Sequence, residues 1–108
     1  IADLCIKYDV FAIADEIYEH MVFDGLQHIP IATLPGMMER TITISGLSKS
    51  YSVTGWRVGY TIAPETLTNA IRKIHDFTTI CAPAPLQKAG ITAMNFGQEY
   101  YDWLTQYY

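Results

Sequence analysis

The chain has 108 residues, 50% of them apolar and 13% aromatic, so it is long enough for one small domain with a hydrophobic core. Its formal net charge of -4 and the lack of a basic run argue against a nucleic-acid-binding surface. No apolar stretch has the length of a membrane span and no signal-peptide pattern is present, so we expect no membrane partner.

The residues that could form disulfides or bind metals are scattered along the chain. Cys5 and Cys81 lie far apart and form no CxxC motif, so a disulfide framework is not expected and a reduced, cytoplasmic compartment is the default. His20, His28 and His75 have no metal-ligand spacing and no accompanying cysteine pair. We therefore predict no metal site.

Both ends of the chain carry the apolar spacing of a helix. Residues 1–8 show this spacing with no capping residue before it, and residues 100–107 show it again up to the last residues. We therefore expect a piece of a larger protein, cut through a helix at each end.

Three short segments have the composition of strands. Residues 10–15 form an apolar run that ends on Asp15, of the kind that parallel sheets bury on both faces. The β-branched residues 41–45 predict a second buried strand, and residues 57–63 predict a third.

Helical patterns follow the third strand. Pro64 is a typical first residue of a helix, and apolar residues recur on one face of residues 65–79. Residues 81–85 interrupt this pattern, a helix over about 86–96 follows, and a last helix covers about 98–108. The order of elements predicts an α/β fold, as part of a mostly parallel sheet with flanking helices.

Lys49 follows the second predicted strand in the polar loop "SGLSKS" (45–50). Ligands of α/β proteins collect beyond the carboxyl ends of strands. A lysine that is partly shielded from water near another cation is an effective nucleophile and can form a Schiff base with an aldehyde. Taken alone, a solvated loop lysine is the better interpretation.

Arg57 is the other cation of this region, and Gly55 before it can turn the chain sharply. A guanidinium binds phosphate through two parallel hydrogen bonds. Hydroxyls and backbone N–H groups nearby can complete an anion site. In isolation, a structural arginine paired with a carboxylate is an equally good interpretation.

Asp15 ends the first strand, where an acid is costly unless it meets a cation or a hydrogen-bond donor. A protonated ring nitrogen would serve, and the phenol of Tyr18 could lie near the same ring. Capping of a helix by Asp15 and core packing of Tyr18 are the alternatives. Together with Lys49 and Arg57, these residues offer an amine, a guanidinium, an acid and a phenol, which suit the aldehyde, phosphate, ring nitrogen and ring hydroxyl of pyridoxal 5′-phosphate.

Three segments of the chain resemble a known family. "GLSKSYSVTGWRVG" (46–59) resembles the lysine signature of class I/II aminotransferases, which have fold type I among pyridoxal-phosphate enzymes. "ADEIYEHMVFDG" (14–25) and "APAPLQKAG" (82–90) are similar to other segments of that family. The resemblance implies that residues 1–108 are part of the large, cofactor-binding domain, cut at both ends, with the final helix leading toward a missing small domain.

The resemblance also implies a role for each candidate residue. Lys49 would bond the cofactor aldehyde and then move a proton at the substrate α-carbon. Asp15 would pair with the ring nitrogen, Tyr18 would bind the 3′ oxygen, and Arg57 would bind the phosphate.

One position departs from the family pattern. Many relatives carry a phosphate-binding serine three residues before the lysine, where this chain has Gly46. Ser48 or Ser45 could replace that serine, so both are candidate cofactor-binding residues.

The implied reaction is transamination between an amino acid and a 2-oxo acid. The glycine-rich phosphate turn, the ring-stacking aromatic residue and the arginine for the substrate carboxylate have no candidates in this chain, and family active sites include residues of a second subunit. We therefore expect a homodimeric parent enzyme and an inactive isolated fragment.

Two other functions remain open at this point. A carbon–sulfur lyase or an aminocyclopropane-carboxylate-synthase-like enzyme would share the same aspartate, tyrosine, lysine and arginine, although "TGWRVGY" favours aminotransferases. A transcription regulator with an aminotransferase-like domain would carry a DNA-binding helix-turn-helix upstream.

Overall fold

The computed structural model, which describes residues 1–108, contains one three-stranded sheet with β2 at its centre. β1 (Ala12–Asp15) pairs in parallel with β2 (Thr41–Gly46), and β3 (Gly59–Ile62) pairs with β2 in the antiparallel direction. The α/β class is confirmed. The sheet is mixed because β3 returns beside β2 without a crossover helix, which a parallel pair would require.

Four α-helices accompany the sheet: α1 (Ala2–Lys7), α2 (Glu65–Thr78), α3 (Ala84–Met94) and α4 (Gln98–Tyr107). All four were predicted, but α3 begins two residues before its predicted start at 86. Pro85 lies in its first turn, where the missing proline N–H would have no helical partner anyway. No helix combines the length and the apolar character that a membrane crossing demands.

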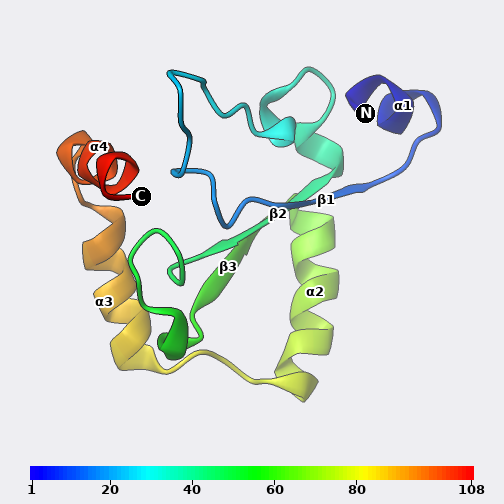
Figure 1. Ribbon diagram of the computed structural model, residues 1–108. Coiled ribbons are helices and arrows are strands. Elements are labelled where there is room, and N and C mark those ends of the chain that lie inside the picture. Colours follow the sequence, from blue (N-terminus) through cyan, green and yellow to red (C-terminus); the bar gives the residue numbers. More distant parts are fainter.

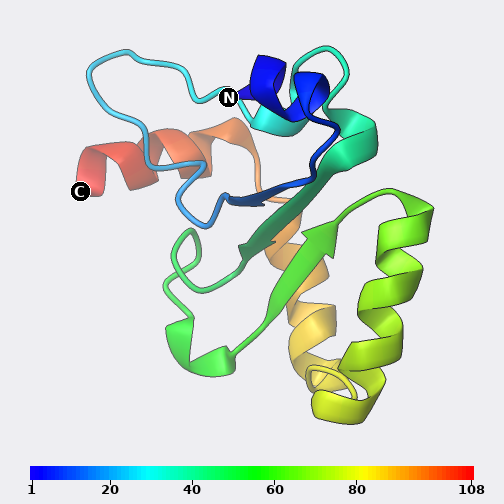
Figure 2. The same ribbon diagram turned by 90° about the vertical axis from the view of Figure 1, so that its right-hand side faces the viewer.

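The helices lie around the sheet rather than beside one another. Figure 1 shows α2 and α3 on opposite sides of β3, joined by the segment that follows α2. In Figure 2 the last helix, α4, lies next to the long connection between β1 and β2 and above the loop between β2 and β3. Short 3-10 helices, η1 (Ile31–Thr33), η2 (Met38–Arg40) and η3 (Thr54–Trp56), interrupt these connections.

The core of this chain is small. Only 10 of the 108 residues are buried, and the largest fully buried side chains include Met37, Leu47 and Leu104. The radius of gyration of 15.6 Å exceeds the roughly 13 Å of a compact domain of this length. The outer strands, predicted to be covered on both faces, are open here, since Ile13 of β1 is 70% exposed and Ile62 of β3 is 58% exposed.

Gly46 ends β2 at a point of close backbone contact, opposite Gly59 in the antiparallel register. A Cβ on Gly46 would lie 2.9 Å from the carbonyl oxygen of Val58 and 3.1 Å from the Cα of Gly59. Both atoms belong to the backbone, so a rotamer change cannot relieve the contact. The family's serine at this position would therefore require β3 to move.

We predict that Gly46→Ala in the full-length protein lowers the free energy of unfolding by about 1–3 kcal/mol, because the added methyl group would overlap with the β3 backbone. Urea unfolding measures this change. Gly55→Ala is the matched control, since a Cβ at Gly55 meets no atom within 4 Å. Equal losses in the two variants would show that the close contact at Gly46 is not the cause.

Candidate active site at the carboxyl edge of the sheet

The sheet pairing brings three distant segments to one edge. In the parallel pair, Asp15 lies next to Ile44, so the chain that follows β1 begins beside the end of β2. In the antiparallel pair, Gly59 lies opposite Gly46, so the residues before β3 begin at the same edge. This edge therefore carries the segments that contain all the predicted site residues.

Lys49 lies in a tight turn directly after β2. The amide of Tyr51 donates to the carbonyl of Leu47 over 3.2 Å, and the amide of Ser52 donates to the carbonyl of Lys49 over 3.2 Å. Ser52 has φ of 55°, a left-handed conformation that is uncommon outside glycine. The turn is therefore held in one shape by its own backbone, with Lys49 at intermediate exposure.

The amine of Lys49 faces the ring of Tyr18. Its Nζ atom lies 5.8 Å from the ring centroid, within the range of a cation–π contact. Both residues line a cleft of about 370 Å³. The other residues that line the cleft are Met21, Ser48, Ser52, Thr54 and Tyr108.

Asp15 begins a turn rather than a helix. Its Oδ1 atom accepts a hydrogen bond of 3.3 Å from the amide of Ile17, and the side chain is exposed. The other carboxylate oxygen has no hydrogen-bond partner in the chain. Asp15 therefore does not cap a helix, which was the alternative considered from the sequence. It begins a local turn that leaves its second carboxylate oxygen free for a ligand.

Arg57 lies at the far end of the same loop with φ of 55°. Its Nη1 atom donates to the carbonyl of Thr54 over 3.2 Å, and the Thr54 hydroxyl donates to the carbonyl of Ser48 over 3.0 Å. Left-handed conformations of residues other than glycine cost on the order of 1–3 kcal/mol each, and they cluster at functional sites. The guanidinium forms no ion pair with a carboxylate, unlike the structural alternative considered from the sequence.

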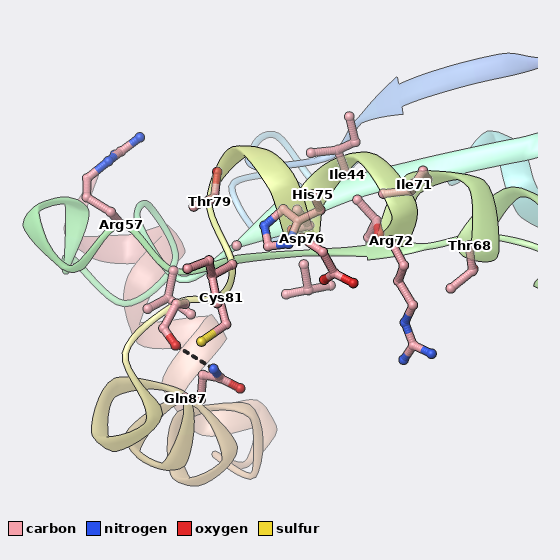
Figure 3. Close-up of a pocket in the computed structure, with 17 residues that line it drawn as sticks. Ile44, Arg57, Thr68, Ile71, Arg72, His75, Asp76, Thr79, Cys81 and Gln87 are labelled. Atoms are coloured by element: carbon pink, nitrogen blue, oxygen red, sulfur yellow. Dashed lines mark hydrogen bonds between the residues drawn. The ribbon is translucent and has the colours of Figure 1, made fainter.

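A larger pocket of about 860 Å³ lies between β3 and α2. Arg57 and Ser45 belong to its lining, but Figure 3 shows the Arg57 side chain pointing away from Cys81 and Gln87. This pocket contains neither Lys49 nor Tyr18. We therefore place the candidate site at the smaller cleft, where the amine is.

The two candidate serines differ in their surroundings. Ser45 is 5% exposed, and its hydroxyl lies 3.1 Å from a carboxylate oxygen of Glu19 and 3.5 Å from the carbonyl of Glu16, so it donates within the chain. Ser48 lines the cleft together with Lys49. The geometry favours Ser48 over Ser45 as a ligand for an added anion.

Several side chains near the site were not singled out from the sequence. Thr54 donates a hydrogen bond to the carbonyl of Ser48, and the serines and threonine between Lys49 and Arg57 (Ser50, Ser52 and Thr54) were the available signal. Tyr51 and Tyr100 were given no role in the site from the sequence, and their rings stack with centroids 5.7 Å apart. Burial raises the pKa of both phenols, and a hydrogen bond with Tyr101 raises the pKa of Tyr51 further.

The histidines have other partners. Nε2 of His28 lies 2.6 Å from a carboxylate oxygen of Glu16, and the His20 ring stacks on Tyr101. The chain has no group of three histidine, cysteine, aspartate or glutamate side chains that could hold a metal ion.

Comparisons with known proteins place the chain in one family. Residues 1–108 match the family model described as aminotransferase class I and II. Kynurenine–oxoglutarate transaminase 3 of Homo sapiens is 49% identical over 89 residues, which cover 82% of this chain and 20% of the human protein. Aspartate aminotransferase of Musicola paradisiaca is 45% identical over 94 residues, which cover 87% of this chain and 24% of that protein.

Solved structures agree with these relatives. The N-succinyldiaminopimelate aminotransferase of Mycobacterium tuberculosis superposes with a TM-score of 0.93 at 34% identity, covering 97% of this chain and 27% of that one. The chain thus spans about a fifth to a quarter of the relatives that it matches. Class I and II aminotransferases use pyridoxal 5′-phosphate. Because the family pattern extends over the whole chain and the fold superposes, this chain belongs to the class I and II aminotransferase family.

Proposed function

We propose that the protein containing this chain is an aminotransferase, which exchanges the amino group of an amino acid with the oxo group of a 2-oxo acid. The position of Lys49 carries the proposal: its amine lies 5.8 Å from the centre of the Tyr18 ring at the carboxyl edge of the sheet. When bound, pyridoxal 5′-phosphate supplies an electron-withdrawing ring that stabilises negative charge at the substrate α-carbon.

The side chains at this edge fit that cofactor. The Lys49 amine has no hydrogen-bond or ion-pair partner in the chain, so it is free to react with an aldehyde. Asp15 offers a carboxylate oxygen without a partner. Ser48, Ser52 and Thr54 supply hydroxyls around the same cleft, as an anionic group requires.

Lys49 and Asp15 take the two chemical roles. The Lys49 amine would hold the cofactor through its aldehyde, with loss of water. Once the substrate amine had displaced it, the free Lys49 amine would move a proton at the substrate α-carbon as a general base and acid. The Asp15 carboxylate would keep the cofactor ring nitrogen protonated, because a nearby negative charge favours the charged form of a base.

Arg57, Ser48 and Tyr18 hold the cofactor in place. The guanidinium of Arg57 and the hydroxyl of Ser48 would bind the phosphate, and the phenol of Tyr18 would donate to the 3′ oxygen. Ser45 is kept as a weaker phosphate ligand because its hydroxyl donates to Glu19.

We propose that residues 1–108 are part of the large domain and that α4 leads toward a small domain. The exposed apolar side chains of the outer strands support this, because such surface requires cover from other parts of a longer protein. The parent is proposed to be a cytoplasmic homodimer that acts on an amino acid and a 2-oxo acid, and the free Cys5 and Cys81 suit that compartment.

We predict that Lys49→Ala in the full-length protein abolishes covalent capture of the cofactor and transamination, because the only amine at the cleft is removed. Reduction with borohydride followed by peptide mass spectrometry reports the capture. A screen of aspartate, aromatic, alanine and kynurenine donors against 2-oxo acids reports the reaction.

Lys73→Ala, on α2, is the control and is expected to retain both signals. If Lys49→Ala keeps the visible absorbance of the bound cofactor, the assignment of Lys49 is wrong. If the unaltered protein neither captures the cofactor nor exchanges an amino group, the proposed function is wrong.

Removing the negative charge of Asp15 tests its proposed pairing with the cofactor ring nitrogen separately from the role of Lys49. Asp15→Asn should lower kcat by about a hundredfold or more while the cofactor stays bonded to Lys49, because a preorganised charge is lost from the reacting ring. Steady-state kinetics with a matched Asp24→Asn control measure this, since Asp24 is also exposed and does not line the cleft. Similar kcat values for Asp15→Asn and the unaltered enzyme would exclude the pairing.

The isolated chain of 108 residues should show no transamination, because it spans only about a fifth to a quarter of its relatives and leaves most of its apolar surface open. A coupled assay for the 2-oxo acid product checks this at high protein concentration. Turnover that disappears in Lys49→Ala would contradict the prediction.

A further inference from the structure

The last helix contacts the Lys49 turn through two tyrosine hydroxyls. Tyr100 donates its hydroxyl to the backbone carbonyl of Ser50 over 2.6 Å, and the hydroxyls of Tyr101 and Tyr51 lie 2.7 Å apart. In each contact the partners are 50 positions apart in the sequence. Ser50 and Tyr51 directly follow Lys49, so α4 reaches the turn immediately beside the amine-bearing residue.

Buried residues hold the turn on both sides of Lys49. Leu47 is 2% exposed and Ser50 is 3% exposed. A Cβ on Gly90 of α3 would lie 2.8 Å from the Cδ1 atom of Leu47, so this helix approaches Leu47 more closely than a larger residue would allow. With α3 against Leu47 and α4 against Ser50, Ser48 and Lys49 between them have little freedom to shift.

Tyr101 also connects α4 to the segment that carries Tyr18. Its ring stacks on the ring of His20 with centroids 4.1 Å apart. The amide of Met21 donates to the carbonyl of Tyr18 over 2.8 Å, so His20 and Tyr18 belong to one turn. The same helix therefore contacts both segments that carry residues of the cleft, the Lys49 turn and the Tyr18 turn.

The hydroxyls suit this task at neutral pH. Burial raises the pKa of Tyr51, with further contributions from the hydrogen bond and the charge of Tyr101, and burial raises that of Tyr100. Both phenols therefore stay protonated and remain able to donate.

We propose that Tyr100 and Tyr101 are positioning residues that hold the Lys49 amine toward Tyr18, although neither lines the cleft. This inference rests on the proposed function, because it concerns the reactivity of Lys49. A small misplacement of a reacting group can cost up to about a hundredfold in rate, so loss of either hydroxyl slows the step assigned to Lys49. Because these hydroxyls do not line the cleft, we expect KM for the substrate to change little.

The test uses Tyr100→Phe and Tyr101→Phe in the full-length protein. The control is Tyr107→Phe, which removes a hydroxyl from the same helix at a side chain that is 70% exposed and has no hydrogen bond in the chain. The first readout is amide hydrogen exchange in the cofactor-free protein. The amides of Tyr51 and Ser52, which close the turn, should exchange several-fold faster in the two test variants than in the control.

The second readout is chemical. The rate at which the cofactor-free protein captures pyridoxal 5′-phosphate at Lys49 should fall in both test variants. In the loaded enzyme, kcat per bound cofactor should fall by about tenfold to a hundredfold, with KM within about twofold. Dividing the rate by the amount of bound cofactor removes the contribution of misfolded protein, which binds none.

Exchange and capture rates equal to those of the unaltered protein would overturn the inference, and so would an equal slowing in Tyr107→Phe. If Tyr100→Phe does not fold, Tyr101→Phe decides alone. If the unaltered protein captures no cofactor, the proposed function is wrong. If the unaltered protein and both variants capture the cofactor equally fast, only this inference is wrong.

Discussion

The pairing of β2 with a neighbour on each side is the constraint on which the candidate site depends. Parallel pairing with β1 places Asp15 beside Ile44, and antiparallel pairing with β3 places Gly59 opposite Gly46. Three segments that are distant in the sequence therefore leave the sheet at one edge. A slip of one residue in either register would turn each strand's side chains to the opposite face and separate these groups.

That edge is crowded, and the crowding shapes the loop that carries Lys49. Gly46 meets the β3 backbone so closely that the chain has no room for a side chain there. The loop that follows Gly46 has left-handed conformations at Ser52 and Arg57. Such a loop costs free energy by itself, and contacts from α3 and α4 offset that cost by holding Leu47 and Ser50.

The same chain leaves much of its apolar surface uncovered. Phe77 of α2 is 93% exposed and Ile74 is 67% exposed. Yet the apolar residues of α2 recur at the spacing of a helix face that packs against a core. The relatives are four to five times longer than the matched segment, as the covered shares of 20% and 24% indicate. The local turn geometry at Lys49 is thus complete within these residues, whereas the hydrophobic core is not.

The sequence alone determined the four α-helices, the three strands and the α/β class, and it placed Asp15 at a strand end and Lys49 in the loop after a strand, because these follow from local composition and periodicity. The direction of β3, the early start of α3 across Pro85 and the bond between Ser45 and Glu19 were decided by tertiary structure. So were the tyrosine contacts to the Lys49 turn, which join positions 50 residues apart. Spacing within a segment reports which face a residue occupies, but only the packing of separate elements decides which groups meet.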